Sequence, residues 1–154
     1  MRIEKLRPHH LLDILKDYAP DDDPDYRPAP GENGVRSVTR ALAASLDTEV
    51  EFVVGPDTIC EPCSHLKPGG KCDRILDRHK PPQPIDEYND DLDRRLLACL
   101  GLTAGARMTL RRFLVLVNAR VPGLEAVCTH PTEERAARLA GLIAGLTRLG
   151  VRAR

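Results

Sequence analysis

Three cysteines lie close together in a turn-rich stretch of the chain. Two residues separate Cys60 from Cys63, and eight residues, which include the Pro-Gly-Gly turn at 68–70, separate Cys63 from Cys72. Two thiolates at the first spacing can bind one metal because the backbone between them makes a tight turn, and the glycines allow the third to fold back toward them. The spacing therefore predicts that Cys60, Cys63 and Cys72 bind one metal centre jointly.

The kind of metal depends on the fourth ligand. Structural zinc takes a closed tetrahedral set, whereas three cysteines and a different or exchangeable group can hold an iron–sulfur cluster. The chain has no second Cys-x-x-Cys pair, and His65 lacks a second histidine at zinc-finger spacing. The residues by themselves therefore leave both an iron–sulfur cluster and zinc open. The candidates for the fourth ligand are Asp13, His10 or His9, Cys128 and Cys99.

The last two of these candidates differ in their expected surroundings. Cys99 lies on the apolar stripe of a predicted helix, where a single cysteine usually acts as a small hydrophobic residue. Cys128 lies just before a helix predicted to start near Pro131, where unpaired N–H groups and the helix dipole stabilise a thiolate. We interpret Cys99 as a core residue. Cys128 stays open as a ligand, a reactive thiol or a cysteine packed beneath a helix start.

Two histidines and an aspartate share a helix predicted from Pro8 to about Tyr18. Proline suits the first turn of a helix because its missing N–H costs nothing there. His9 and His10 precede Asp13 by four and three residues, so each pair shares a helix face. These histidines are candidates to orient Asp13 or to transfer protons beside the metal. The alternative is a histidine pair that caps the helix start.

The elements that must position these residues are mainly helical. Apolar residues recur at helical spacing in 33–47, in 92–100 and in 131–150, while 49–55 has the β-rich composition of a strand. A short helix is expected over 73–79. The segment 107–120 is apolar and fits either a helix or a strand.

The sequence therefore predicts one domain of the α+β class over residues 1–154, with one or two short strands beneath the cysteine loop at 57–76. The segment 19–34 holds four prolines and four aspartates and can bury little apolar surface. We expect it to be a mobile surface loop that approaches the metal side of the domain.

Composition excludes several classes of function. Lys plus Arg equals Asp plus Glu at 23 each, and no basic block is present, so nucleic acid is not an expected partner. The N-terminal residues lack the apolar run of a signal peptide, and no later segment has membrane-spanning length. We expect a cytoplasmic protein, in which an odd number of cysteines, five, favours metal binding or reactivity over disulfides.

Two segments resemble a family of small prokaryotic proteins. They are LRPHHLLDIL at 6–15 and VVGPDTICEPCSHLKPGGKCDRIL at 53–76. The family is known as a domain of unknown function and is described as predicted to bind iron–sulfur. It has an Arg-x-His-His-Leu-Leu-Cys segment followed by a helix, a strand, an Asp-x-Ile-Cys-x-x-Cys segment and a further cysteine. The resemblance covers roughly the first hundred residues. It implies an iron–sulfur cluster, which we expect to be of the 4Fe-4S type, with zinc as the alternative. It also implies that the ligands are Cys60, Cys63 and Cys72, and that the residues near the site are Arg7, His9 and His10.

The chain departs from that pattern at Asp13, where the family has its first cysteine. A carboxylate is a weaker ligand for cluster iron than a thiolate, so Asp13 would leave one iron open unless Cys128 replaces it. We therefore expect an enzyme with Lewis-acid, lyase, sulfur-transfer or redox chemistry on a small molecule. The alternative is a protein-interaction module that zinc or a cluster merely clamps.

Overall fold

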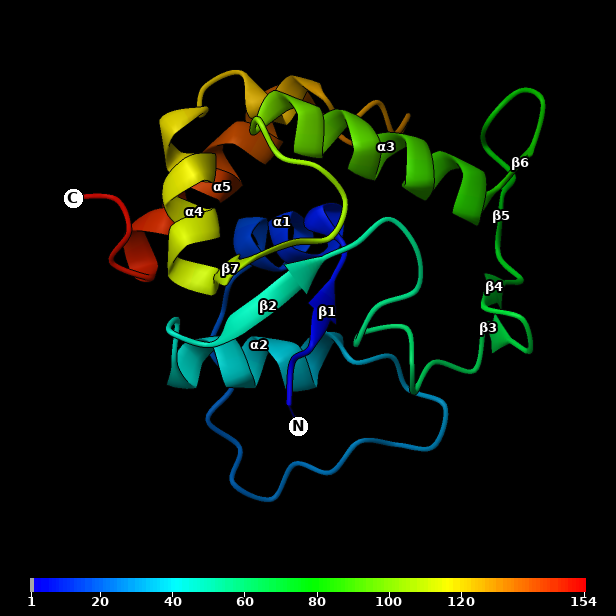
Figure 1. Ribbon diagram of the computed structural model, residues 1–154, viewed down its shortest axis with the longest axis horizontal. Coiled ribbons are helices and arrows are strands. Elements are labelled where there is room, and N and C mark those ends of the chain that lie inside the picture. Colours follow the sequence, from blue (N-terminus) through cyan, green and yellow to red (C-terminus); the bar gives the residue numbers. More distant parts are fainter. Residues whose placement is uncertain (1) are drawn as a thin grey trace.

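A small mixed sheet lies at the centre of the computed structural model, which describes residues 2–154 (Figure 1). Strand β2 (Glu49–Phe52) is the middle strand; it pairs in parallel with β1 (Lys5–Leu6) and antiparallel with β7 (Ala106–Thr109). Val50 and Phe52 point into the core and are fully buried, as the two-residue period of a strand requires. The Phe52 ring stacks on Phe113, with 3.9 Å between the ring centroids.

Helices surround this sheet and supply most of the core. Each has one apolar face, and the buried leucines of that face pack on the sheet or on a neighbouring helix. The predicted class, a mainly helical α+β domain, is confirmed. The helices are α1 (Pro8–Lys16), α2 (Val35–Ala44), α3 (Ile85–Cys99), α4 (Leu110–Ala119) and α5 (Arg135–Arg148), with a short 3-10 turn, η1 (Leu124–Ala126), before α5.

Helices α1 and α5 approach closely because α5 carries glycine at two positions one turn apart. A Cβ atom on Gly141 would lie 2.6 Å from the Lys16 carbonyl oxygen, and one on Gly145 would overlap the Leu15 carbonyl. Only hydrogen fits at either position. This contact fixes α1, which carries both histidines, against the C-terminal helix.

The cysteine loop folds into two small hairpins beyond the helical body, at the right of Figure 1. Strand β3 (Leu66–Lys67) pairs with β4 (Lys71–Cys72), and β5 (Ile75–Leu76) pairs with β6 (Gln83–Pro84). The helix predicted over 73–79 is therefore wrong. That segment has only two adjacent apolar residues and no helical stripe, and the prolines after it favour the extended partner strand. These hairpins add strands to the one or two expected.

The acidic segment connects α1 to α2 and runs along the lower edge of the molecule in Figure 1. Asp21 pairs with Arg36 and Arg40 of α2, and the Arg36 guanidinium lies 4.0 Å from the centre of the Tyr26 ring. Farther along, the Gly31 carbonyl accepts a hydrogen bond of 3.0 Å from the Ser64 N–H. The segment thus reaches the cysteine loop; its mobility stays a prediction.

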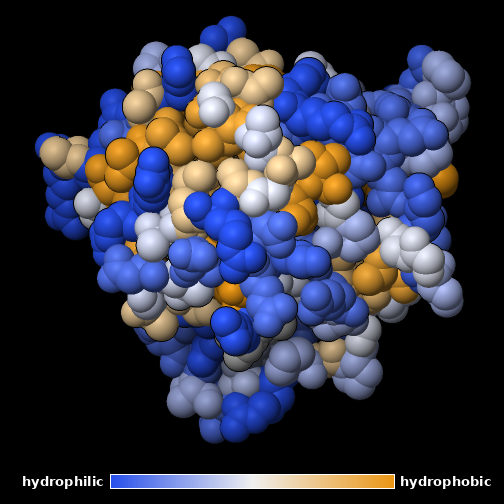
Figure 2. Space-filling view, in the orientation of Figure 1, coloured by the Kyte–Doolittle hydropathy of each residue, from blue (hydrophilic) through white to orange (hydrophobic). Residues whose placement is uncertain are grey.

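The surface differs between the two ends of the molecule. Figure 2 shows hydrophilic residues over most of the hairpins, while hydrophobic residues gather over the helical body, around α4. Among residues 2–154, no helix is both long enough and apolar enough to cross a membrane.

Candidate metal centre

One cavity of about 110 Å³ is lined by all three cysteines of the loop, and we call it the metal cavity because thiols are metal-binding groups. The cysteines are half-buried, and His10 of α1 also lines the cavity. Further lining residues are Asn33 from the acidic segment and Arg74 beside β5. The structure therefore brings Cys60, Cys63, Cys72 and His10 together from distant parts of the sequence.

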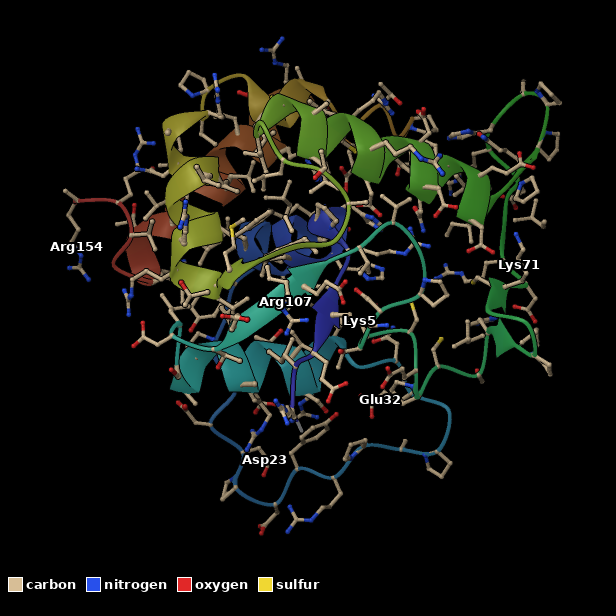
Figure 3. The ribbon with its side chains drawn as sticks, viewed as in Figure 1. Lys5, Asp23, Glu32, Lys71, Arg107 and Arg154 are labelled. Atoms are coloured by element: carbon tan, nitrogen blue, oxygen red, sulfur yellow. The ribbon has the colours of Figure 1, made fainter. Side chains whose placement is uncertain are left out.

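Backbone hydrogen bonds hold the cysteines in place. The Cys63 N–H donates to the Cys60 carbonyl at 2.9 Å, which closes the tight turn expected for their spacing. Asp86 in the first turn of α3 accepts from the Cys72 N–H at 2.8 Å. In Figure 3, Lys71, the residue before Cys72, lies at the right of the molecule, beside β4.

Asp57 joins the cysteine loop to the N-terminal helix, and it is the most important residue missing from the sequence-based candidates. Its buried carboxylate accepts from the Arg7 N–H at 2.7 Å, from His10 Nδ1 at 2.8 Å and from the Cys60 N–H at 3.1 Å. Burial alone would raise the pKa of Asp57, but the hydrogen bond and charge of His10 lower it below its usual range. The signal in the sequence was the Asp-x-Ile-Cys pattern at 57–60, which places this aspartate three residues before the first cysteine of the loop.

Donor atoms of His10, Asp57 and Cys60 lie within 4.8 Å of one another, and in residues 2–154 no other set of three or more His, Cys, Asp or Glu is so close. The three loop sulfurs are thus not all within that distance. Around one zinc ion, tetrahedral geometry with Zn–S bonds of about 2.3 Å would place them about 3.8 Å apart. A cluster binds each thiolate through a different iron and accepts donors that are farther apart.

Burial raises the pKa of the Cys60 thiol to about 12, and the negative charge of Asp57 adds to the effect. As long as no metal is bound, Cys60 is therefore protonated at neutral pH. Binding of a metal at this sulfur would release that proton.

His9 and Arg7 face α3 through the fully buried carboxylate of Asp93. Asp93 accepts from Arg7 Nη1, His9 N–H and His9 Nδ1, each at 2.9 Å. Arg7 Nη1 also donates to Asp90 at 2.8 Å, and Arg7 lines the metal cavity. These two residues fasten α1 to α3, which sets the position of His10 beside the cysteines.

Asp13 and Cys128 line a second cavity, of about 310 Å³, and neither lines the cavity of the three cysteines. Asp13 Oδ1 lies 3.3 Å from Arg138 Nη1 and 3.8 Å from Lys16 Nζ. Cys128 Sγ donates to Glu133 Oε2 at 3.2 Å. The assignment of Asp13 or Cys128 as fourth ligand stays a prediction. Their position outside the cavity of the three cysteines does not favour it.

The environment of Cys128 also differs from the one expected. Helix α5 begins at Arg135 rather than near Pro131, because Glu133 forms a turn, its N–H donating to the His130 carbonyl at 3.1 Å. Cys128 therefore does not precede a helix start directly, and burial raises the pKa of its thiol.

Cys99 lies where the sequence suggested, and His65 lies outside the cavity of the three cysteines. Cys99 packs against the core from α3. His65 is about half exposed and bonds to Asp73 at 2.8 Å, so it belongs to the solvated surface of the loop.

The fold and the site define a class of protein: a mainly helical α+β domain with a cysteine-lined cavity at one end. The chain belongs to the family described as Protein of unknown function (DUF1284), whose profile matches residues 32–132. The match includes all five cysteines, while the segment 6–15, which carried part of the resemblance, lies outside it. No curated protein and no solved structure matches the chain.

Proposed function

We propose that the protein binds an iron–sulfur cluster at the cysteine loop through Cys60, Cys63 and Cys72. The observation that carries this proposal is the single cavity that the three half-buried thiols line together with His10. Soft thiolate ligands select iron–sulfur clusters and zinc over harder ions. The spread of the three sulfurs supports a cluster, in which each thiolate has its own iron.

His10 takes the fourth position in this proposal, in place of Asp13 or Cys128. Its Nδ1 donates to Asp57, which leaves Nε2 as the nitrogen with a free lone pair. A carboxylate on the far ring nitrogen is the usual partner of a metal-binding histidine, because it fixes the tautomer and the ring orientation. Asp13 is instead held by Arg138 and Lys16.

The proposed activity is chemistry on a small molecule at the His10 side of the cavity. A bound cluster with an exchangeable, non-cysteine ligand supplies a Lewis-acid or redox centre. Asp57 holds His10, Asp86 holds the backbone of Cys72, and Arg7 keeps α1 docked on α3. The reducing cytoplasm is part of the proposal, since it keeps free thiols available for a cluster.

The test is the metal content of protein purified without oxygen. We expect iron, acid-labile sulfide and broad absorption near about 400 nm. Single replacements Cys60→Ala, Cys63→Ala and Cys72→Ala should each lose most of the iron, while Cys99→Ala, on α3, is the matched control and should keep it. Full iron content in all three loop variants would refute the assignment.

A structural zinc site is the second candidate. The observation in its favour is the close set of His10, Asp57 and Cys60, whose donor atoms lie within 4.8 Å of one another as around one ion. A zinc-clamped loop would serve as a protein-interaction module without catalysis. One zinc per chain in a colourless preparation, without sulfide, would decide for it.

A further inference from the structure

The second cavity adjoins the metal cavity, and we propose that it binds a small molecule bearing a carboxylate, held by Arg138 next to His10. The role of that molecule as a substrate rests on the proposed function, whereas its binding needs no cluster. The two cavities share the lining residues His10, Arg74, Ile85 and Asn89. A ligand in the second cavity would therefore lie against the wall of the first.

The size of the second cavity suits a small molecule. It lies between α1, α3 and the start of α5 and holds about 310 Å³. This volume corresponds to roughly ten water molecules at about 30 Å³ each, and it lies at the lower end of the range for small-molecule sites.

Arg138 lines this cavity, and one half of its guanidinium has no partner in residues 2–154. The side chain is only 4% exposed, and its hydrogen bonds, to Asp13 Oδ1 at 3.3 Å and Glu133 Oε2 at 2.6 Å, both use Nη1. Nε and Nη2 have no protein partner in residues 2–154. Among these residues, His79 Nε2 is the only fully buried side-chain nitrogen or oxygen without a partner. Nε and Nη2 therefore retain some accessible surface. Nε and Nη2 together form the edge that binds a carboxylate with two parallel hydrogen bonds.

The charges around the cavity also favour an anion. Lys16 and Arg138 already balance Asp13 and Glu133. Arg74 is exposed, lines both cavities and forms no ion pair within residues 2–154, so it adds a positive charge to the lining. A small carboxylate between Arg138 and Arg74 would complete the charge balance.

Cys128 provides a chemical reporter at this position. Its sulfur and Arg138 Nη1 bond to the same oxygen, Glu133 Oε2, so the thiol and the guanidinium are neighbours. Cys128 does not line the separate hollow of about 220 Å³ to which Arg138 and Lys16 also contribute. A reagent that reaches Cys128 therefore reports on the second cavity.

The experiment compares alkylation by iodoacetate and by iodoacetamide, with each cysteine followed by peptide mass spectrometry. Both reagents react alike: the thiolate attacks the CH₂ carbon, a C–S bond forms, and iodide leaves. The thiolate fraction is common to both and cancels in the ratio of rates. Relative to Cys99 as internal reference, Cys128 should favour iodoacetate by about tenfold, which equals about 1.4 kcal/mol.

Ligand protection and variants complete the test. Succinate should slow the labelling of Cys128 and leave that of Cys99 unchanged. Arg138→Gln should abolish the preference for iodoacetate, whereas Arg135→Gln, at an exposed position on the same helix, should retain it. If Arg138→Gln does not fold, Arg74→Gln is the substitute variant and should weaken the preference.

Equal ratios at Cys128 and Cys99, or no protection by succinate, would overturn the proposal. Protection by sulfate as strong as by succinate at equal ionic strength would overturn the assignment to a carboxylate. Repeating the labelling in Cys60→Ala separates the two proposals, because a preference that survives without iron supports the carboxylate site by itself. A protein with iron and sulfide but no preference would keep the cluster and reject the carboxylate.

Discussion

Two adjacent histidines on α1 have different partners because successive helix positions point about 100° apart. His9 is buried against α3 and bonds to Asp93 at 2.9 Å. His10 points to the cysteine loop and bonds to Asp57 at 2.8 Å. The first histidine therefore serves stability, and the second belongs to the proposed metal site.

Replacing each histidine by alanine should separate these roles. His9→Ala removes the partner of a buried carboxylate and should lower the free energy of unfolding by about 1–3 kcal/mol. His10→Ala should instead lower metal retention or change the spectrum of the bound metal, with a smaller effect on stability. Stability is measured by chemical denaturation and metal content by metal analysis, both on both variants, so that each variant is the control for the other. Equal loss of metal in both would contradict the division.

Glu133 should make stability depend on pH. Burial would raise its pKa, but the hydrogen bond from Lys16 and the nearby charges lower it to about 2, below its usual value of 4.5. Its stabilising contribution is therefore complete above about pH 4.5 and is lost as the pH falls toward about 2.

Glu133→Gln should accordingly lower the free energy of unfolding at pH 7, and the difference from the parent protein should shrink as the pH falls from about 4.5 to about 2. Glu134→Gln, at the exposed neighbouring position, is the control and should change little. A difference that is constant with pH would show that Glu133 does not act through its charge.

The sequence could not separate the site residues as the structure does. His9 and His10 both lie within one helical turn of Asp13, and only partners 84 and 47 residues away distinguish them. Asp13 attracted attention because it replaces a cysteine of the related pattern, but the chain's own Arg138 pairs with it from α5. Long-range ion pairs of this kind leave no periodic signal in the sequence.

Among the elements, the crossing of α1 and α5 depends on Gly145. Alanine would normally favour a helix by about 0.5–1 kcal/mol over glycine, but its methyl group would overlap the Leu15 carbonyl. We expect Gly145→Ala to lower the free energy of unfolding by at least about 2 kcal/mol in chemical denaturation, because the helices must separate.

Ala140→Gly, an exposed position on the same helix, is the matched control and should cost only about 1 kcal/mol of helix propensity. If Gly145→Ala were neutral, α1 and α5 would have to be less tightly packed than the structure shows.

The elements were predictable where they are long and periodic. The apolar stripes of α1, α2 and α5 have a period near 3.6 residues, and each of these helices lies in the expected segment. The segment 107–120, which fitted either structure, is both, since β7 ends at Thr109 and α4 begins at Leu110. The hairpin strands have two residues each, too few for any pattern, and they form because the turns bring extended segments together.

At the scale of the whole molecule, the apolar core and the candidate metal site occupy different parts. Past Ile59, the cysteine loop and its hairpins contribute no fully buried hydrophobic side chain among the described residues until α3, and Ile75 is 56% exposed. The helices and the central sheet, in contrast, share one continuous core. The loop therefore depends on hydrogen bonds, and in our proposal on metal, for its shape.

Removing metal with a chelator should loosen the hairpins and leave the body folded. Hydrogen exchange followed by mass spectrometry should show faster exchange in residues 60–84 and little change in α4 and α5. Protein that has never been loaded with metal serves as the reference for the loosened state. Unfolding of the entire domain would mean that the site supports the core as well.

The walls of the metal cavity come from α1, from the cysteine loop and from Asp86 of α3, so the cavity cannot exist early in the synthesis of the chain. When Cys72 has been added, all three thiols are present, but Asp86 and the Asp93 carboxylate that anchors α1 have not yet been made. At about 5–20 residues per second, the chain needs a few seconds to reach α3 from Cys60. During that interval the thiols are exposed without a site around them, so in our proposal the complete site, with His10 beside the cysteines, forms only after α1 docks on α3.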